Sequence, residues 1–242
     1  MKRCIFCFLI FSLSLQLTSL AQQPVPSSSR ARKAIMQVRP RLDQDFLNSK
    51  LHIGSPIFLR IFKEEKILEV WVKNEDDFQL FREYQICTYG SESLGPKIRQ
   101  GDGLAPEGFY FVTPKRLNPL SQFHLSFNLG YPNQYDRVHK RTGSALMVHG
   151  DCVSIGCYAM TDEKIEEIYT IADAALRNGQ EFFRVHIFPF RMTAENMKRH
   201  DKSKWYTFWE NLKEGYDIFE HNSHIPPNVE VVNKRYVFGH SL

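Results

Sequence analysis

A histidine and a cysteine lie eight positions apart in residues 147–162, which have the sequence MVHGDCVSIGCYAMTD. A thiolate nucleophile needs a base within hydrogen-bond reach, and a short glycine-containing loop can bring His149 and Cys157 together. Gly156 lets the backbone turn sharply, so that the amides of Gly156 and Cys157 can form an oxyanion hole. The pattern predicts cysteine acyl-transfer chemistry, with Cys157 as the nucleophile and His149 as the general base and acid.

Each of these residues also has a structural interpretation. Cys157 can be a small buried residue, and His149 can be a core histidine with satisfied hydrogen bonds. Ser154 is expected to support the loop through a local hydrogen bond, the alternative being that it orients His149. A zinc site built from His149, Cys152 and Cys157 would lack a fourth ligand. No metal and no cofactor are therefore predicted.

The His-Gly pair followed by Ser-x-Gly-Cys resembles the active-site motif of the L,D-transpeptidases, the YkuD-type catalytic domain of bacterial cell-wall enzymes. The form found here is similar to the YafK-like branch of that family. The resemblance covers residues 51–189, including GDGLAPEGFY at 101–110 and HLSFN at 124–128. In the broader family the histidine lies further upstream, and an arginine follows two places after the cysteine. Ala159 stands at that place here.

The resemblance implies a peptidoglycan substrate. Cys157 would attack the carbonyl at the L-centre of a diaminopimelate residue in a stem peptide and form an acyl-enzyme, while a backbone carbonyl can orient His149. Transfer of the acyl group from Cys157 to an amine would make a crosslink. The YafK-like form implies instead an amidase that hydrolyses the link between diaminopimelate and the lysine of an outer-membrane lipoprotein. A hypothesis of another class is a non-catalytic cell-wall-binding module, with Cys157 held in a disulfide with Cys152.

Polar residues alternate with apolar ones over residues 124–128, so one face of a strand there would be polar. That face can line the substrate groove or belong to a solvated edge strand, and the resemblance favours the groove. The following loop carries side chains that can grip a stem peptide, although such a loop is often simply solvated. The expected substrate-binding residues are His124, Ser126, Asn128, Tyr131 and Arg137.

The N-terminus has the features of a signal peptide. Lys2 and Arg3 precede an apolar run at residues 5–17, and Ser19-Leu20-Ala21 predicts cleavage after residue 21. An uncleaved anchor is the alternative, but the run is short for a transmembrane helix, so no stable membrane insertion is expected. Loss of the two basic residues lowers the formal charge from +4 to +2, which does not suggest a nucleic-acid partner. The expected location is the periplasm of a Gram-negative bacterium.

Three of the five cysteines remain after signal cleavage, namely Cys87, Cys152 and Cys157. An odd number in an exported protein suggests one free thiol. A Cys87–Cys152 disulfide would leave Cys157 free and would suit an oxidising compartment, whereas a Cys152–Cys157 disulfide would block it. The sequence does not decide between these pairings.

The predicted fold class is mainly β with α (α+β), a YkuD-like β-sandwich catalytic domain with C-terminal helices. The predicted organisation is a signal peptide at 1–21, a flexible leader at 22–39, the catalytic domain at 40–190, and a helical and strand extension at 191–242 packed on the same domain. Alternating or β-rich runs and helical spacing define the elements. Strands are expected at 56–62, 67–72, 81–88, 109–112, 124–128, 145–148, 182–190 and 229–238, and helices at 42–47, 162–177 and 204–219.

Overall fold

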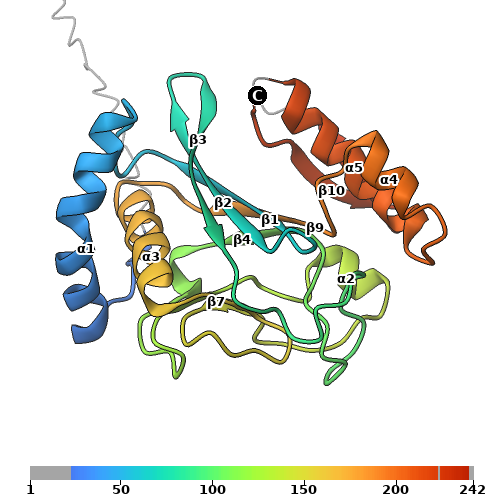
Figure 1. The fold of residues 1–242 in the computed structure, drawn as a ribbon, viewed down its shortest axis with the longest axis horizontal. Helices are drawn as coiled ribbons and strands as arrows, with labels where there is room; N and C mark the ends of the chain where they lie inside the picture. The colour runs from blue at the N-terminus through green and yellow to red at the C-terminus, as the bar shows by residue number, and fades with distance from the viewer. Residues whose placement is uncertain (1–22, 223, 240–242) are drawn as a thin grey trace, which may run out of the picture.

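The main sheet of the protein has five strands in the order β3-β2-β1-β9-β4 in a computed structural model that describes residues 23–222 and 224–239 (Figure 1). Strand β1 runs parallel to β9, and the other neighbouring pairs are antiparallel. The sheet is therefore mixed, and the α+β class predicted from the sequence is confirmed. The strands are β1 Ile57–Phe62, β2 Ile67–Asn74, β3 Asp77–Gln85, β4 Gly108–Val112 and β9 Phe183–Phe188.

Both faces of this sheet are covered, which explains why β1 is a nearly continuous apolar run rather than an alternating one. On one face Leu59 and Ile61 belong to the central core, together with residues of helix α3 (Asp162–Arg177). On the other face Phe58 packs with Trp71 and with Phe219 of helix α5 (Tyr206–His221). The C-terminal part of the chain thus shields the side of the sheet that faces away from the central core.

A second sheet has the order β5-β6-β7-β8 and consists of β5 Leu117–Asn118, β6 Ser126–Asn128, β7 Met147–His149 and β8 Tyr158–Ala159. Phe127 lies opposite Val148, and Val148 lies opposite Tyr158. These three side chains are fully buried in the central core. Side chains alternate across a strand, so His149 and Ser126 lie on the opposite face. Figure 1 shows β7 in the lower layer of the molecule, below the main sheet.

The predicted flexible leader is partly wrong, because residues 29–39 are helical. Helix α1 spans Ser29–Asn48, and the Ser28 hydroxyl caps it by accepting a hydrogen bond from the Ala31 amide. The helix packs alongside α3 (Figure 1). Its polar composition suggested mobility, but a stripe at helical spacing is buried. That stripe consists of Ala31, Ala34, Val38, Leu42 and Phe46. The predicted signal peptide lies outside the described residues.

The C-terminal extension contains a strand hairpin where the sequence suggested a single strand at 229–238. Strands β10 (Asn228–Val232) and β11 (Arg235–Gly239) are antiparallel, and the two residues between them have positive φ, as a tight hairpin turn requires. Helix α5 begins at Tyr206 rather than at residue 204, and the short helices α2 (Gln134–Val138) and α4 (Ala194–Arg199) were not predicted. Among the described residues no helix is long and apolar enough to cross a membrane.

A fully buried ion pair ties this extension to the loop that precedes β4. Lys63 Nζ donates to Glu107 Oε1 at 2.9 Å and to the Gly95 carbonyl at 2.7 Å. The other carboxylate oxygen of Glu107 accepts from Trp209 Nε1 at 2.8 Å. Burial lowers the pKa of Lys63, and the carboxylate of Glu107 acts in the opposite direction. Because every partner is satisfied, α5 holds residues 95–107 in a fixed position, and these residues form one wall of the site described below.

Candidate active site

Cys157 stands at the start of β8, beside the end of β7. Val148 and His149 pair with Tyr158 and Ala159 in parallel register, so Cys157 is level with Met147. Its Sγ accepts a hydrogen bond from the Met147 amide at 3.4 Å and lies 3.7 Å from the Ala145 carbonyl oxygen. The cysteine is partly exposed and its thiol is free. The structure therefore brings the two residues of the motif to neighbouring strands at one edge of the second sheet.

The ring of His149 is held by a backbone carbonyl. Its Nδ1 lies 2.6 Å from the Gly150 carbonyl oxygen, which can only accept, so Nδ1 carries the proton and Nε2 keeps a free electron pair. The ring of Phe123 packs on it, with the ring centres 4.7 Å apart. Burial lowers the pKa of His149, and the Gly150 carbonyl partly offsets this effect. The imidazole is consequently neutral near pH 7 and can accept a proton at Nε2.

The thiol of Cys157 is in its neutral form at the same pH. Burial raises its pKa, while the Met147 amide and the charge of Lys97 act in the opposite direction with smaller effects. Lys97 is itself buried and is paired with Asp102 at 2.7 Å. A thiol with a raised pKa needs a base to become a nucleophile, and a neutral imidazole is suited to that task.

The loop before Cys157 is held by Ser154. The Ser154 hydroxyl donates to the Cys157 carbonyl at 2.7 Å and accepts from the Gly156 amide at 2.9 Å. The Gly156 amide, which was predicted to serve an oxyanion, is therefore engaged by Ser154 in this structure. The amide of Cys157 has no hydrogen-bond partner within the described part of the chain. It remains available as an oxyanion donor.

Glycine is required at two places where backbones meet beside the cysteine. Gly156 has φ +147°, and a Cβ there would lie 3.1 Å from the Leu104 carbonyl oxygen. A Cβ on Gly90 would lie 2.3 Å from the Gly103 oxygen and 2.7 Å from the Gly156 nitrogen. Side chains at these positions would push the 89–107 loop away from the cysteine loop. The close approach of three backbone segments thus fixes the position of Cys157.

The structure resolves the cysteine pairing that the sequence left open, because Cys87 and Cys152 form a disulfide. The Cys87 amide donates to the Ala159 carbonyl at 2.9 Å, and the Cys152 amide donates to the Met160 carbonyl at 3.0 Å. The disulfide therefore attaches the cysteine loop to the segment that follows β3. Cys157 is left unbonded, which removes the Cys152–Cys157 bond of the non-catalytic hypothesis. Cys152 is likewise not a thiolate that could bind zinc.

The double variant Cys87→Ser/Cys152→Ser is expected to lose about 2–5 kcal/mol in the free energy of unfolding, because the disulfide restricts the unfolded chain over a long loop. Urea unfolding of the purified protein measures the difference. Cys157→Ser is the matched control, since it also replaces a cysteine by serine but breaks no disulfide, and it should change stability by much less. Equal stabilities of the double variant and the parent protein would contradict a structural role for the bond.

Ala159 occupies the place where the resemblance leads one to expect an arginine. Its side chain is fully buried, it pairs with His149 across the two strands, and it forms a bridge to Thr88. A methyl group therefore lies where a guanidinium would otherwise stand beside the histidine. This position offers no cation to a substrate carboxylate.

Two of the five predicted groove residues share the face of His149. Ser126 pairs directly with His149, is fully buried, and donates through its hydroxyl to Met147 Sδ at 3.3 Å. Asn128 pairs with Met147, and its side chain accepts from the Gly130 amide at 2.7 Å. Both side chains are already engaged within the protein.

His124 is not on the strand face where alternation placed it. The residue has φ +62° and precedes β6, so the strand begins only at Ser126. Its Nε2 lies 2.8 Å from Glu166 Oε1, and its Nδ1 lies 4.0 Å from an Asp162 oxygen. The imidazole therefore pairs with the first turns of α3 and is not aligned with the polar face of β6.

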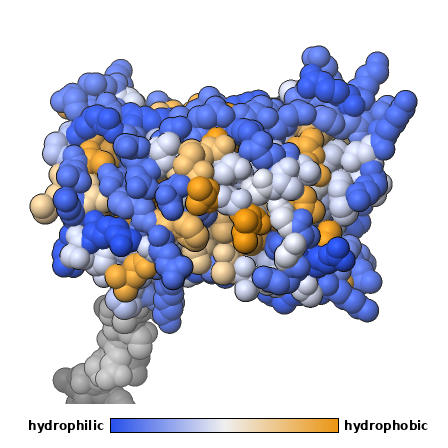
Figure 2. All heavy atoms as spheres, turned by 60° about the horizontal axis from the view of Figure 1, so that its bottom comes forward, coloured by the Kyte–Doolittle hydropathy of each residue, from blue (hydrophilic) through white to orange (hydrophobic). Residues whose placement is uncertain are grey.

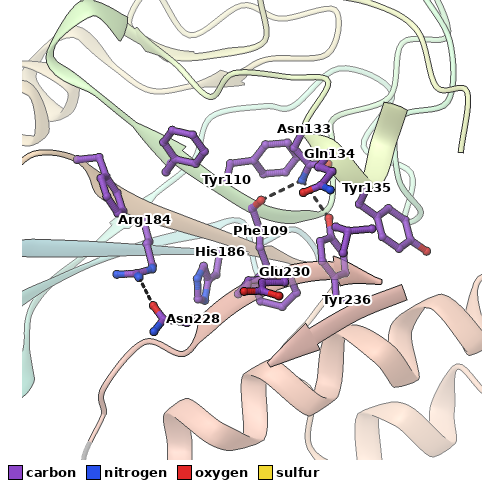
Figure 3. A pocket seen from close by; sticks show the side chains of 14 residues that line it. Phe109, Tyr110, Asn133, Gln134, Tyr135, Arg184, His186, Asn228, Glu230 and Tyr236 are labelled. Atoms are coloured by element: carbon purple, nitrogen blue, oxygen red, sulfur yellow. Dashed lines mark hydrogen bonds between the residues drawn. The ribbon is translucent and has the colours of Figure 1, made fainter. Parts of the chain in front are cut away.

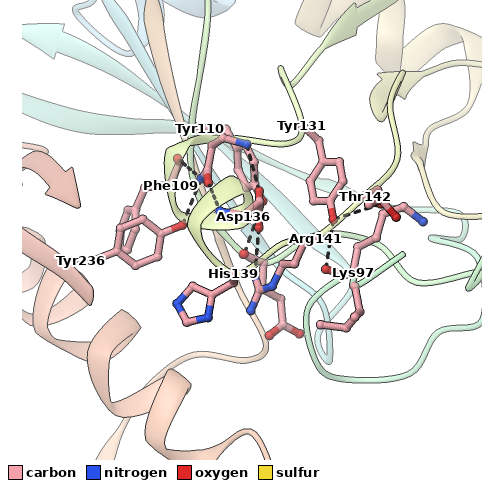
Figure 4. A network of polar contacts seen from close by, with 12 residues as sticks. Lys97, Phe109, Tyr110, Tyr131, Asp136, His139, Arg141, Thr142 and Tyr236 are labelled. Atoms are coloured by element: carbon pink, nitrogen blue, oxygen red, sulfur yellow. Dashed lines mark hydrogen bonds and ion pairs between the residues drawn. The ribbon is translucent and has the colours of Figure 1, made fainter. Parts of the chain in front are cut away.

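The structure also does not place Tyr131 and Arg137 together as two substrate contacts. Tyr131 is buried and donates to the Lys97 carbonyl at 3.2 Å, whereas Arg137 lies exposed on α2 and donates to the Pro132 carbonyl. Beside them a buried pair joins Arg141 Nη1 to Asp136 Oδ1 at 2.9 Å (Figure 4). Tyr131 thus supports the loop that carries Lys97, and α2 is fixed by its own ion pair.

Sequence reasoning missed Lys97 and Phe123. Lys97 was not distinguishable from other loop cations, although its partner Asp102 lies five residues later, a spacing that a tight turn can close. Phe123 precedes the segment judged to be a strand, and only the tertiary structure places it on His149. Neither residue carries a local motif.

A cavity of about 400 Å³ lies away from Cys157, between the edge of the main sheet and the β10–β11 hairpin (Figure 3). Its lining includes Phe109, Arg184 and His186, and Arg184 donates to Asn228 at 2.7 Å. Arg184 and His186 alternate with Val185 and Ile187, which face the central core. The cavity is therefore on the other face of the main sheet, and Cys157 does not line it.

Comparison with known proteins agrees with the motif. The L,D-transpeptidase catalytic domain, YkuD, matches residues 57–187. The chain is 52% identical over 190 residues to YafK of Escherichia coli K12, which is described as a candidate L,D-transpeptidase, and equally to YafK of E. coli O157:H7. The match covers 78% of this chain and 76% of each relative.

Solved structures show a weaker likeness. A variant of the helical cell shape determining protein Pgp2 from Campylobacter jejuni matches with a TM-score of 0.45 and 21% identity, over 68% of this chain and 56% of that chain. Bd1075 of Bdellovibrio bacteriovorus matches with a TM-score of 0.39 and 24% identity, over 69% of this chain and 61% of that chain.

Proposed function

Because this chain belongs to the L,D-transpeptidase catalytic domain family, we propose that it modifies peptidoglycan through an acyl-enzyme formed on Cys157. The observation that carries the proposal is the free thiol of Cys157 at the start of the strand that pairs with the strand of His149, whose Nδ1 is held by the Gly150 carbonyl. This arrangement supplies a nucleophile, a base with an available Nε2, and a group that orients the base.

In the proposed reaction, Cys157 Sγ attacks the carbonyl at the L-centre of a diaminopimelate residue in a stem peptide. His149 Nε2 takes the thiol proton as the carbon–sulfur bond forms. The amide of Cys157 donates to the oxygen that becomes negative, because Gly156 is already engaged with Ser154. His149 then gives the proton to the leaving amine, the carbon–nitrogen bond breaks, and a thioester remains on Cys157.

The fate of the thioester defines the product. An amine acceptor gives a crosslink or a protein attachment, which is transpeptidation, and water gives hydrolysis. Ala159 favours the second candidate, an amidase that releases an outer-membrane lipoprotein by hydrolysing its diaminopimelate–lysine link. In the wider family an arginine stands at this position, and its replacement by a buried methyl group suggests a different leaving group.

The proposal places the protein in the periplasm of a Gram-negative bacterium. The signal-like residues 1–21 would direct export, and the Cys87–Cys152 disulfide suits an oxidising compartment. The proposed partners are peptidoglycan stem peptides and a peptidoglycan-linked lipoprotein. The catalytic unit would be residues 40–190 together with the first part of helix α1, with residues 191–242 packed on the same domain.

Mass spectrometry of muropeptides distinguishes the two reactions. Purified sacculi that carry bound lipoprotein are incubated with the protein or with Cys157→Ala. Hydrolysis is expected to release the lipoprotein and to increase free tripeptide stems, with the wild type only. New diaminopimelate–diaminopimelate crosslinks, accompanied by loss of terminal D-alanine, would instead identify a crosslinking transpeptidase. No change with the wild type in either product would contradict the proposed function.

A further inference from the structure

The peptide group that joins Gly150 to Asp151 has a hydrogen bond at each end. Its carbonyl oxygen lies 2.6 Å from His149 Nδ1, and its N–H donates to Asp162 Oδ1 at 2.8 Å. A peptide group is planar and conjugated, so a hydrogen bond at one end strengthens the one at the other end. A single peptide group therefore connects the ring of the candidate base to a carboxylate in the first turn of α3.

The approach of this carboxylate depends on the glycine that follows the histidine. A Cβ on Gly150 would lie 2.5 Å from Asp162 Oδ1, so a side chain there would force the carboxylate away from the Asp151 amide. The Gly150 amide is held as well, since it donates to the carbonyls of Phe123 and Leu125. The backbone after the histidine is thus fixed on both sides, and the carboxylate is the only charged group among these partners.

The side chain of Asp162 has one short contact and one long one. Its second carboxylate oxygen lies 4.0 Å from His124 Nδ1, whereas His124 Nε2 lies 2.8 Å from Glu166 Oε1. The first turn of a helix favours a negative charge, which suits a carboxylate at this position. The short contact of Asp162 is therefore with the peptide group that orients His149, and the imidazole of His124 belongs mainly to Glu166.

The ring of His149 lies where water competes little for these hydrogen bonds. His149 is 2% exposed, and Phe123 packs on its ring. The second sheet lies in the lower layer of Figure 1, and Figure 2, which brings that side forward, shows apolar side chains gathered at its middle. Hydrogen bonds in such surroundings are stronger than in water, so a charge at one end of the chain affects the other end.

We propose that Asp162 is a positioning residue for His149, acting through the Gly150–Asp151 peptide group. The carboxylate holds this group with its carbonyl toward Nδ1 and increases the negative charge on the carbonyl oxygen. It thereby stabilises the imidazolium that forms when Nε2 takes the thiol proton of Cys157. The inference rests on the proposed function, in which His149 is the base. Asp162 itself neither takes nor gives a proton.

The rate of acylation by a carbapenem measures this effect. Asp162→Ala is expected to lower the rate about tenfold at pH 7, because the peptide group is no longer held. Asp162→Asn keeps an oxygen that can accept from the Asp151 amide, so its rate should return to within about threefold of the wild type. Glu163→Ala is the matched control, since it removes the neighbouring exposed carboxylate of the same helical turn, and it should react like the wild type.

A titration of His149 distinguishes positioning from a purely structural role. NMR follows the imidazole in Cys157→Ala proteins, which cannot react. The Gly150 carbonyl raises the pKa of His149, so weakening that hydrogen bond with Asp162→Ala should lower this pKa by about half a pH unit. The acidic limb of the acylation rate should move to lower pH by the same amount. Glu163→Ala should leave both where they are in the parent protein.

A double variant provides a second distinction. In a His149→Ala background there is no base to position, so adding Asp162→Ala should not slow acylation further. If Asp162 only supported the loop that leads to Cys157, the additional substitution would slow acylation in both backgrounds equally. Should Asp162→Ala not fold, Asp162→Asn supplies the same comparisons, with the same direction and a smaller effect.

The outcomes separate the positioning role from the proposed function. An unchanged rate and titration in the Asp162 variants, or an equal loss in the His149→Ala background, would overturn the positioning role, while labelling of the wild type would still support Cys157 as the nucleophile. A wild type that carbapenems do not label would overturn both. A loss confined to proteins that contain His149, together with a lowered pKa of that residue, supports the inference.

Discussion

Replacing Cys157 with alanine is expected to yield a folded protein that a carbapenem no longer acylates and that releases nothing from sacculi. The rate should fall by a factor on the order of ten thousand or more, because the covalent step loses its nucleophile. Cys87 and Cys152 are bonded to each other, so neither can replace it. Intact-mass spectrometry after incubation with a carbapenem measures the labelling directly, by the mass added to the wild type.

The control for this prediction is the stability of the variant. Cys157 Sγ makes two weak polar contacts, to the Met147 amide and near the Ala145 carbonyl, and packs only partly against the core, so its loss should cost roughly 1 kcal/mol in the free energy of unfolding. Urea unfolding therefore tells loss of chemistry from loss of fold. A labelled Cys157→Ala protein, or a wild type that remains unlabelled both before and after reduction, would count against Cys157 as the nucleophile.

The motif predicts where the chemistry lies because it is local. Residues 147–162 contain β7, the glycine turn and β8, so spacing along the chain is close to spacing in the fold. Ser154 and Gly156 illustrate the limit of this reasoning. Their types predicted a supported turn, but their mutual hydrogen bond, which occupies the Gly156 amide, depends on side-chain torsions that the sequence does not reveal.

The residues that approach Cys157 from distant parts of the sequence could not be predicted, for a different reason. Lys97 and Cys87 lie more than fifty residues before Cys157, and no repeat or spacing relates them to it. His124 shows that alternation alone is insufficient, since a single positive φ removes it from the strand face. Helix α1 was not predicted at its full length because only one narrow stripe of its twenty residues is buried. Composition averages over such a stripe, whereas packing against α3 depends on it.

Replacing His149 with alanine is expected to lower the rate of Cys157 acylation by about a hundredfold to ten-thousandfold at neutral pH, because the thiol loses its base. The pH dependence should change as well. Burial lowers the pKa of His149, so in the wild type the base is neutral at pH 7 and the rate should fall only when the pH drops below about 6.5, the ordinary value. Acylation rates measured from pH 5 to 10 test this for both proteins.

The acylation rate above neutral pH shows more clearly whether His149 acts as the base. Without His149 the reactive species is the free thiolate, and burial raises the pKa of the Cys157 thiol. The rate of His149→Ala should therefore rise about tenfold for each pH unit through neutrality and continue rising beyond the ordinary thiol range. Added imidazole should restore part of the neutral rate, because the substitution vacates the space of one imidazole ring beneath Phe123. A variant with the wild-type pH profile and no response to imidazole would mean that His149 supports the strand but does not move the proton.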